Sequence, residues 1–136
     1  MNDPLSPREQ SFEALRWLLY RWAPPLLVDV DEPDHYSLIT RLQKKTGTPL
    51  RFGSTRILKT YVSFKFTPLH LNPELGANLS PALLKRKQGL YSFNFDEPMP
   101  ALFDELRAMV KKGYEEFVVR GYIGFPEIRR LDGPLR

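Results

Sequence analysis

The 136-residue sequence contains no cysteine and only two histidines. Without cysteine the chain can form no disulfide, no thiolate metal site and no cysteine nucleophile. The histidines, His35 and His70, lie in no HxH or HExxH spacing that would impose metal geometry. We therefore interpret each of them first as a half-buried polar residue.

Glycine-rich loops and long apolar runs are also missing. The glycines are scattered, so no phosphate-binding loop is recognisable, and no Gly-x-Ser-x-Gly elbow marks a hydrolase nucleophile. No run approaches the roughly 20 apolar residues that span a bilayer. The N-terminus shows no secretory pattern, which favours a cytoplasmic location. We therefore expect a chain without enzymatic activity, without a nucleotide cofactor and without a membrane partner.

The remaining composition is that of one folded domain. Hydrophobic residues make up 42% of the chain and aromatic residues 12%, and 136 residues suffice to bury a core. Twenty Lys and Arg against sixteen Asp and Glu give a net charge of +4, a mild preference for anionic partners. With no repeat or linker, we predict a single domain over 1–136, with its core at about 10–120 and a partly docked tail at 121–136.

Two long helices are predicted near the ends of this domain. Ser6 and Glu9 form a capping box, and Pro24–Pro25 end the first helix. The second helix runs from about Pro100 to Arg120. The apolar stripes at helical spacing are Phe12, Leu15, Leu18, Leu19 and Trp22 in the first helix, and Leu102, Leu106, Met109, Val110 and Phe117 in the second.

Strands are predicted between these helices. Residues 50–58 and 60–67 are rich in β-branched and aromatic residues, and 90–95 ("LYSFNF") alternates. A short helix is expected between Ser80 and Gly89, whereas 35–42 ("HYSLITRL") fits either a strand or a short helix. We predict an α+β fold of two layers, with about four or five mostly antiparallel strands against the terminal helices. The residues expected to point inward are Val62, Phe64, Phe66, Tyr91, Phe93 and Phe95.

An acidic cluster, "VDVDEPDH", is the first candidate site. Carboxylates with one imidazole are suitable ligands for Fe(II), Mn or Mg. Pro33 excludes a calcium loop of the Asp-x-Asp-x-Asp-Gly kind. The alternative is a solvated loop whose acids cap the backbone. The candidate metal ligands are Asp29, Asp31, Glu32, Asp34 and His35.

Basic residues interleaved with aromatics are the second candidate site. Sheets that bind single-stranded nucleic acid use such a pattern for phosphate contact and base stacking. Alternation, however, puts Phe64 opposite Lys65, whereas a stacking platform needs aromatic side chains on the basic side. We therefore interpret the pattern first as a polar solvent face over an aromatic core. The run "KRK" is also explained as a favourable charge at a helix C-terminus. The candidate residues are Arg51, Arg56, Lys59, Lys65, Lys85, Arg86 and Lys87.

The order of elements resembles that of the YdhG-like domain family. The similarity is carried by "TYVSFKFTPLH" (60–70) and "SPALLKRKQGLYSFNFDEPMPALFDEL" (80–106), and it covers roughly 10–120. It implies a compact two-layer α+β domain with an antiparallel sheet. Some members of that family are described as frataxin-like iron chaperones, which implies Fe2+ as a ligand.

Three functions follow from these observations. The first is a non-catalytic cytoplasmic binding domain of unassigned ligand, monomeric or homodimeric. The second is a frataxin-like metallochaperone that holds iron at the acidic cluster. The third is a nucleic-acid-binding adaptor that uses the basic residues of the strands.

Overall fold

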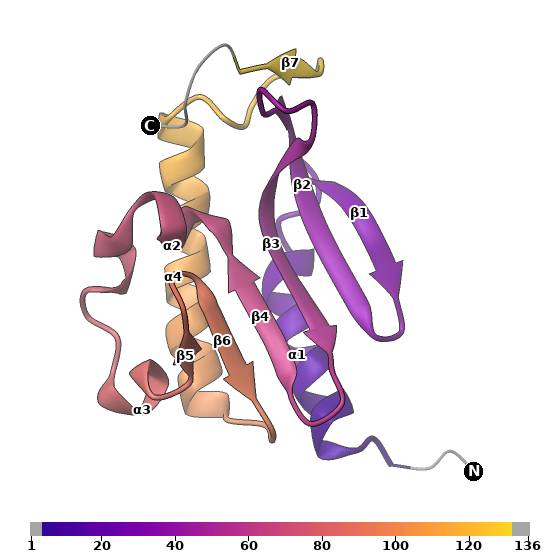
Figure 1. Cartoon of the computed structure of the whole chain (residues 1–136), viewed down its shortest axis with the longest axis vertical. Coiled ribbons are helices and arrows are strands. Elements are labelled where there is room, and N and C mark those ends of the chain that lie inside the picture. Colours follow the sequence, from indigo (N-terminus) through magenta and orange to yellow (C-terminus); the bar gives the residue numbers. More distant parts are fainter. Residues whose placement is uncertain (1–3, 132–136) are drawn as a thin grey trace.

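The computed structural model describes residues 4–131. Its strands form one sheet in the order β1-β2-β3-β4-β6-β5, and β7 lies beside the end of β2 (Figure 1). Every pairing is antiparallel except that of β2 with β7. The elements are α1 (Pro7–Tyr20), β1 (Leu27–Glu32), β2 (His35–Gln43), β3 (Pro49–Ile57), β4 (Val62–Phe66), α2 (Thr67–Leu71), the 3-10 helix η1 (Pro73–Gly76), α3 (Pro81–Leu84), β5 (Lys87–Gln88), β6 (Ser92–Phe95), α4 (Pro100–Val119) and β7 (Arg129–Arg130).

Helices α1 and α4 pack side by side on one face of the sheet (Figure 1). The predicted α+β class, with a mostly antiparallel sheet against the first and last helices, is confirmed. Five strands have four residues or more, and β5 and β7 have two residues each. The opposite face of β2, β3 and β4 is turned toward the viewer in Figure 1 and carries neither of the long helices.

Helix α1 begins at the predicted capping box. The Ser6 hydroxyl accepts a hydrogen bond from the Glu9 amide at 3.1 Å, and the Ser6 amide donates to the Glu9 carboxylate at 3.0 Å. These bonds satisfy two amides that the first turn of a helix leaves without partners. The predicted stripe of α1 is buried except for Trp22, which is half-buried and stacks on Tyr114 of α4 at 4.4 Å between ring centroids.

The core is an aromatic layer between the sheet and α4. Phe52 of β3 meets Phe66 of β4 edge to face at 5.2 Å and Phe117 of α4 at 5.7 Å. All five predicted stripe residues of α4 are buried. At Gly113 the helix backbone approaches Phe66 so closely that an added Cβ would overlap its ring and would lie 2.9 Å from the Pro68 Cβ.

The region that the sequence left open forms a β-hairpin. Residues 35–42 belong to strand β2, which pairs with both β1 and β3. The tail docks in part: Tyr122, Ile123 and Phe125 are buried, whereas Ile128 is exposed. Strand β7 then pairs with Leu42 and Gln43 of β2.

The helix predicted between Ser80 and Gly89 is shorter than expected. It ends at Leu84, and Lys87 already pairs with Phe93 in the β5–β6 hairpin. The basic run therefore does not lie in the last turn of a helix, because backbone pairing with β6 takes over the segment. Gly89 makes the hairpin turn with a φ of 73°, a conformation that favours glycine. Tyr91, predicted to point inward, precedes β6 and is half-buried.

No helix within residues 4–131 is long and apolar enough to cross a membrane.

The contact at Gly113 predicts an unusual effect of Gly113→Ala. In an unconstrained helix this change stabilises by about 1 kcal/mol. Here the added methyl group must displace Phe66, which is fully buried, so we expect the free energy of unfolding to fall by about 1–3 kcal/mol. Urea denaturation measures the effect. The control Glu115→Ala, on the exposed side of α4, should stay within about 0.5 kcal/mol of wild type. A Gly113→Ala protein more stable than wild type would contradict the packing.

Candidate anion-binding face

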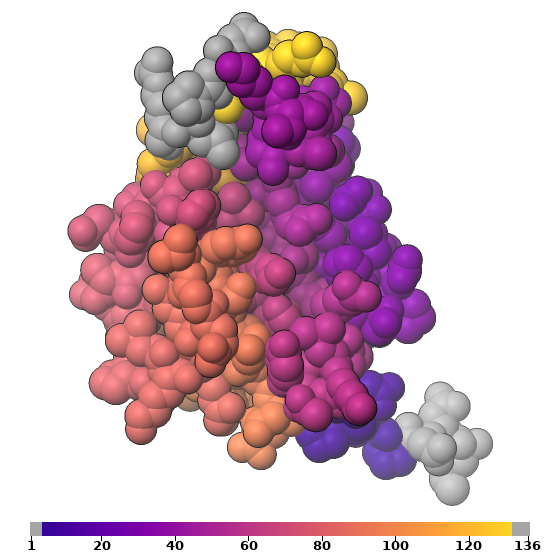
Figure 2. Space-filling model, viewed as in Figure 1, coloured from indigo at the N-terminus to yellow at the C-terminus, as the bar shows by residue number. Residues whose placement is uncertain are grey.

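The sheet surface opposite α1 and α4, here called the open face, carries a set of polar and basic side chains. Directly paired residues of neighbouring strands point to the same side of a sheet. Ser54 pairs with Lys65 and Arg56 pairs with Ser63, so these side chains share the open face. Figure 2 shows the molecule from this side. The residues assigned to the open face are Leu27, Val30, Glu32, His35, Ser37, Ile39, Arg51, Ser54, Arg56, Ser63, Lys65, Ser92 and Asn94.

Long basic side chains surround short hydroxyl side chains on the open face. Ser54 and Ser63 are buried at the level of the sheet, whereas Arg51, Arg56 and Lys65 are exposed. The alternation that buries Phe64 and Phe66 against the helices turns Lys65 outward between them. The same sequence pattern therefore builds the core on one side and a basic surface on the other.

A groove of about 600 Å³ lies on the open face. Its lining includes the cations Lys44, Arg51 and Lys65 and one carboxylate, that of Asp29. Positive charge therefore outnumbers negative charge along the groove. Strands β1, β2, β3 and β4, the turn after β2, helix α2 and the segment before β6 all contribute residues to it.

The basic side chains of the open face form no ion pairs in the described part of the chain. The ion pairs within residues 4–131 involve cations that do not belong to the open face, namely Arg16, Arg86, Arg107, Arg120 and Arg129. His35 pairs directly with Arg56 on the neighbouring strand, so its imidazole lies close to this positive charge. Its pKa is lowered, first by burial and then by the charges of Arg56 and Arg51. The carboxylates of Glu32 and Asp34 act on His35 in the opposite direction, but more weakly than the two arginines. Positive charge therefore outweighs negative charge around His35.

Two rings line the groove. His70 of α2 and Tyr91 lie 5.3 Å apart between ring centroids, tilted by 48°. The Tyr91 carbonyl accepts a hydrogen bond from the Phe66 amide at 2.9 Å, which fixes the segment beside β4. Through this contact the structure places an aromatic side chain in the same groove as Lys65.

The structure divides the seven basic residues that the sequence nominated. Arg51, Arg56 and Lys65 share the open face, whereas Lys59 lies in the turn between β3 and β4. The run 85–87 lies at the end of α3 and on β5, at the edge of the sheet, where Arg86 pairs with Asp96 at 3.2 Å.

Lys44, His70 and Tyr91 were missed as site residues. Each lies outside the alternating part of a strand, in a turn, a short helix and a connecting segment. Strand periodicity therefore carries no signal for them. His70 lies in α2, directly after β4. Tyr91 reaches the groove through the adjacency of β4 and β6, which are separated by α2, η1, α3 and β5 in the sequence.

The acidic cluster is spread over different surfaces. Asp29 lines the groove of the open face, whereas Asp31 turns to the helix side and pairs with Arg16 of α1 at 3.5 Å. Glu32 and Asp34 are exposed at the β1–β2 turn. Within residues 4–131 no three Asp, Glu or His side chains come together as a group that could hold a metal ion. The structure therefore does not bring the five candidate ligands together. In a regular strand Asp29 and Asp31 would share a face, but the β-bulge between Val28 and Val30 separates them.

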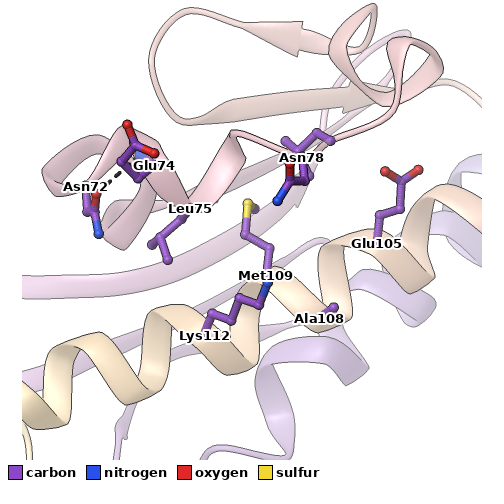
Figure 3. Close-up of a pocket in the computed structure, with 9 residues that line it drawn as sticks. Asn72, Glu74, Leu75, Asn78, Glu105, Ala108, Met109 and Lys112 are labelled. Atoms are coloured by element: carbon purple, nitrogen blue, oxygen red, sulfur yellow. Dashed lines mark hydrogen bonds between the residues drawn. The ribbon is translucent and has the colours of Figure 1, made fainter.

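A second cavity, of about 250 Å³, lies between η1 and α4 (Figure 3). Two of its polar side chains are engaged in hydrogen bonds that cap short helices. The Asn72 side chain accepts a hydrogen bond from the Glu74 amide at 3.2 Å. The Glu105 carboxylate accepts from the Ser80 amide at 2.8 Å and from its hydroxyl at 2.7 Å. These bonds hold the starts of η1 and α3, so the cavity is a weaker candidate than the groove.

A scan against protein-family models found no match for this chain. Searches of the curated proteins and of the solved structures returned no significant match either. The resemblance to the YdhG-like family stays a prediction from the sequence, and the open face is interpreted from its own residues.

The field of the open face predicts the titration of His35. Its pKa should lie below the ordinary value of about 6.5. Around that pH the folded protein binds fewer protons than the unfolded chain, so the free energy of unfolding should fall as the pH drops below about 6.5.

An NMR titration of the imidazole resonances measures this pKa. Arg56→Gln should raise it toward the ordinary value without fully restoring it, because burial is the larger cause. A pKa at or above the ordinary value in wild type would contradict the prediction, and a pKa unchanged by Arg56→Gln would show that Arg56 does not act on His35.

Proposed function

We propose that this chain is a non-catalytic binding domain that recognises an anionic ligand on its open face. The observation that carries the proposal is the set of exposed cations Arg51, Arg56 and Lys65 on one face, which form no ion pair within residues 4–131. Arg51 and Lys65 also line the groove. A concave surface lined by charges of one sign concentrates ligands of the opposite sign.

The chemistry of the groove suits binding. Arginine and lysine hold phosphate or carboxylate groups through charge-assisted hydrogen bonds, and the arginine fork grips two oxygens at once. The half-buried side chains of Ser92 and Asn94 add neutral donors and acceptors on the same face. These groups attract and orient an anion.

The proposal includes the remaining expectations from the sequence. We infer a cytoplasmic, monomeric or homodimeric domain of YdhG-like fold. The iron-chaperone alternative receives no support from the arrangement of the acidic residues, because they point to different surfaces.

Binding of inorganic polyphosphate tests the proposal. We expect the amide resonances of β3 and β4 to shift during an NMR titration at low salt. Arg51→Ala/Lys65→Ala should weaken binding by about tenfold or more, since a hydrogen bond to a charged group is worth about 1.5–3 kcal/mol.

The matched control is Lys111→Ala/Lys112→Ala on α4, which removes the same charge from exposed positions across the molecule. Binding that is absent in wild type, or an equal loss in both double variants, would contradict a site on the open face.

A further inference from the structure

We propose that the anionic ligand is a single strand of nucleic acid, with its phosphates along the cations of the open face and a base on the ring of Tyr91. This inference rests on the proposed anion-binding function. It adds the class of ligand and a role for the two rings of the groove.

The cations form a row along the sheet. Arg51 and Arg56 lie in the same strand, five residues apart, which corresponds to about 15 Å. Lys65 on the neighbouring strand is paired with Ser54, between the two arginines. Lys44 follows Gln43, which pairs with Pro49, so it adds a cation beyond Arg51, and it lines the same groove. A single phosphate cannot contact both ends of this row, whereas a strand with regularly repeated phosphates can follow it.

The rings of Tyr91 and His70 offer stacking surfaces, which a nucleic acid can use through its bases and a simple polyanion cannot. Tyr91 and His70 lie beside Lys65 in the same groove, and His70 is exposed. Proteins that bind single strands combine a basic track with aromatic side chains on which bases stack, largely without sequence preference. The open face therefore meets both requirements with residues from β3, β4, α2 and the segment before β6.

The shape of the face favours a single strand over a duplex. Duplex DNA is entered through its major groove by a helix or a two-stranded ribbon. Here the cations stand on the broad surface of a sheet, and Tyr91 lines the groove beside Lys65. A base must leave its stack before it can lie on such a ring. Ser92 and Asn94, half-buried on the same face, can donate to or accept from base edges.

Fluorescence anisotropy with labelled 12-mers of oligo-dT and oligo-U tests the inference, with inorganic polyphosphate and a duplex of equal length for comparison. Tyr91→Leu keeps an apolar side chain but removes the ring, so we expect about five- to tenfold weaker oligonucleotide binding and unchanged polyphosphate binding. Tyr91→Phe should restore binding close to wild type. His70→Ala, at an exposed position, should weaken oligonucleotide binding without any risk to the core.

The matched control is Tyr20→Leu, which removes an exposed ring from α1, away from the open face. Arg51→Ala and Lys65→Ala should each lower the slope of log affinity against log salt by about 0.7, the value for one phosphate contact on a single strand. Tighter binding of oligo-U would identify RNA as the preferred ligand, and tighter binding of oligo-dT would identify DNA. Both results support the inference.

Two results would overturn the inference while the proposed function stands. The first is polyphosphate bound as tightly as the oligonucleotides, with Tyr91→Leu and His70→Ala changing neither. The second is a duplex bound as tightly as the single strand. Absence of binding to any of these polyanions would overturn the proposed function as well.

Discussion

The aromatic layer between the sheet and the two long helices is the contact on which the rest of this domain depends. Phe52, Phe66 and Phe117 meet there as edge-to-face pairs, and each is fully buried. With no cysteine in the chain, no disulfide can replace this packing. Close approach at Gly113 brings α4 onto Phe66 and Pro68, so the position of the helix depends on the aromatic ring beneath it.

One-sided packing determines what the other face can be. Strand β4 points Phe64 and Phe66 toward the helices, so Lys65 between them must point away from the helices. Because no long helix covers the opposite face, its side chains can keep their charge in water. The basic surface and the core are therefore two consequences of the same period-two pattern. Residues of α2 and of the segment before β6 complete the lining of the groove on that surface.

Much of the fold was predictable because its signals are local. The capping box of Ser6 and Glu9, the apolar stripes and the alternation around Phe64 each lie within a few residues of sequence. The end of the helix after Ser80 was wrong because Lys87 pairs with Phe93, a tertiary contact that propensity does not contain. The strand assignment of 35–42 stayed open for the same reason, since it depends on pairing with β1 and β3.

The candidate site was predictable only in part. Arg51, Arg56 and Lys65 were nominated from strand patterns, and the structure places them on one face. His70 joins them from α2, directly after β4, and Tyr91 joins them through the adjacency of β4 and β6, which the order of residues does not reveal. The acidic residues show the converse: they are neighbours in sequence, yet Asp29 and Asp31 point to opposite sides of a strand.

Chemical acetylation of lysines, followed by mass spectrometry with and without polyphosphate, shows which surface the anion covers. We expect the ligand to protect Lys65 and Lys44, which line the groove, several-fold. Lys111 and Lys112 on α4 should react at unchanged rates. Equal protection of all four lysines, or protection confined to α4, would contradict the assignment of the open face as the binding surface.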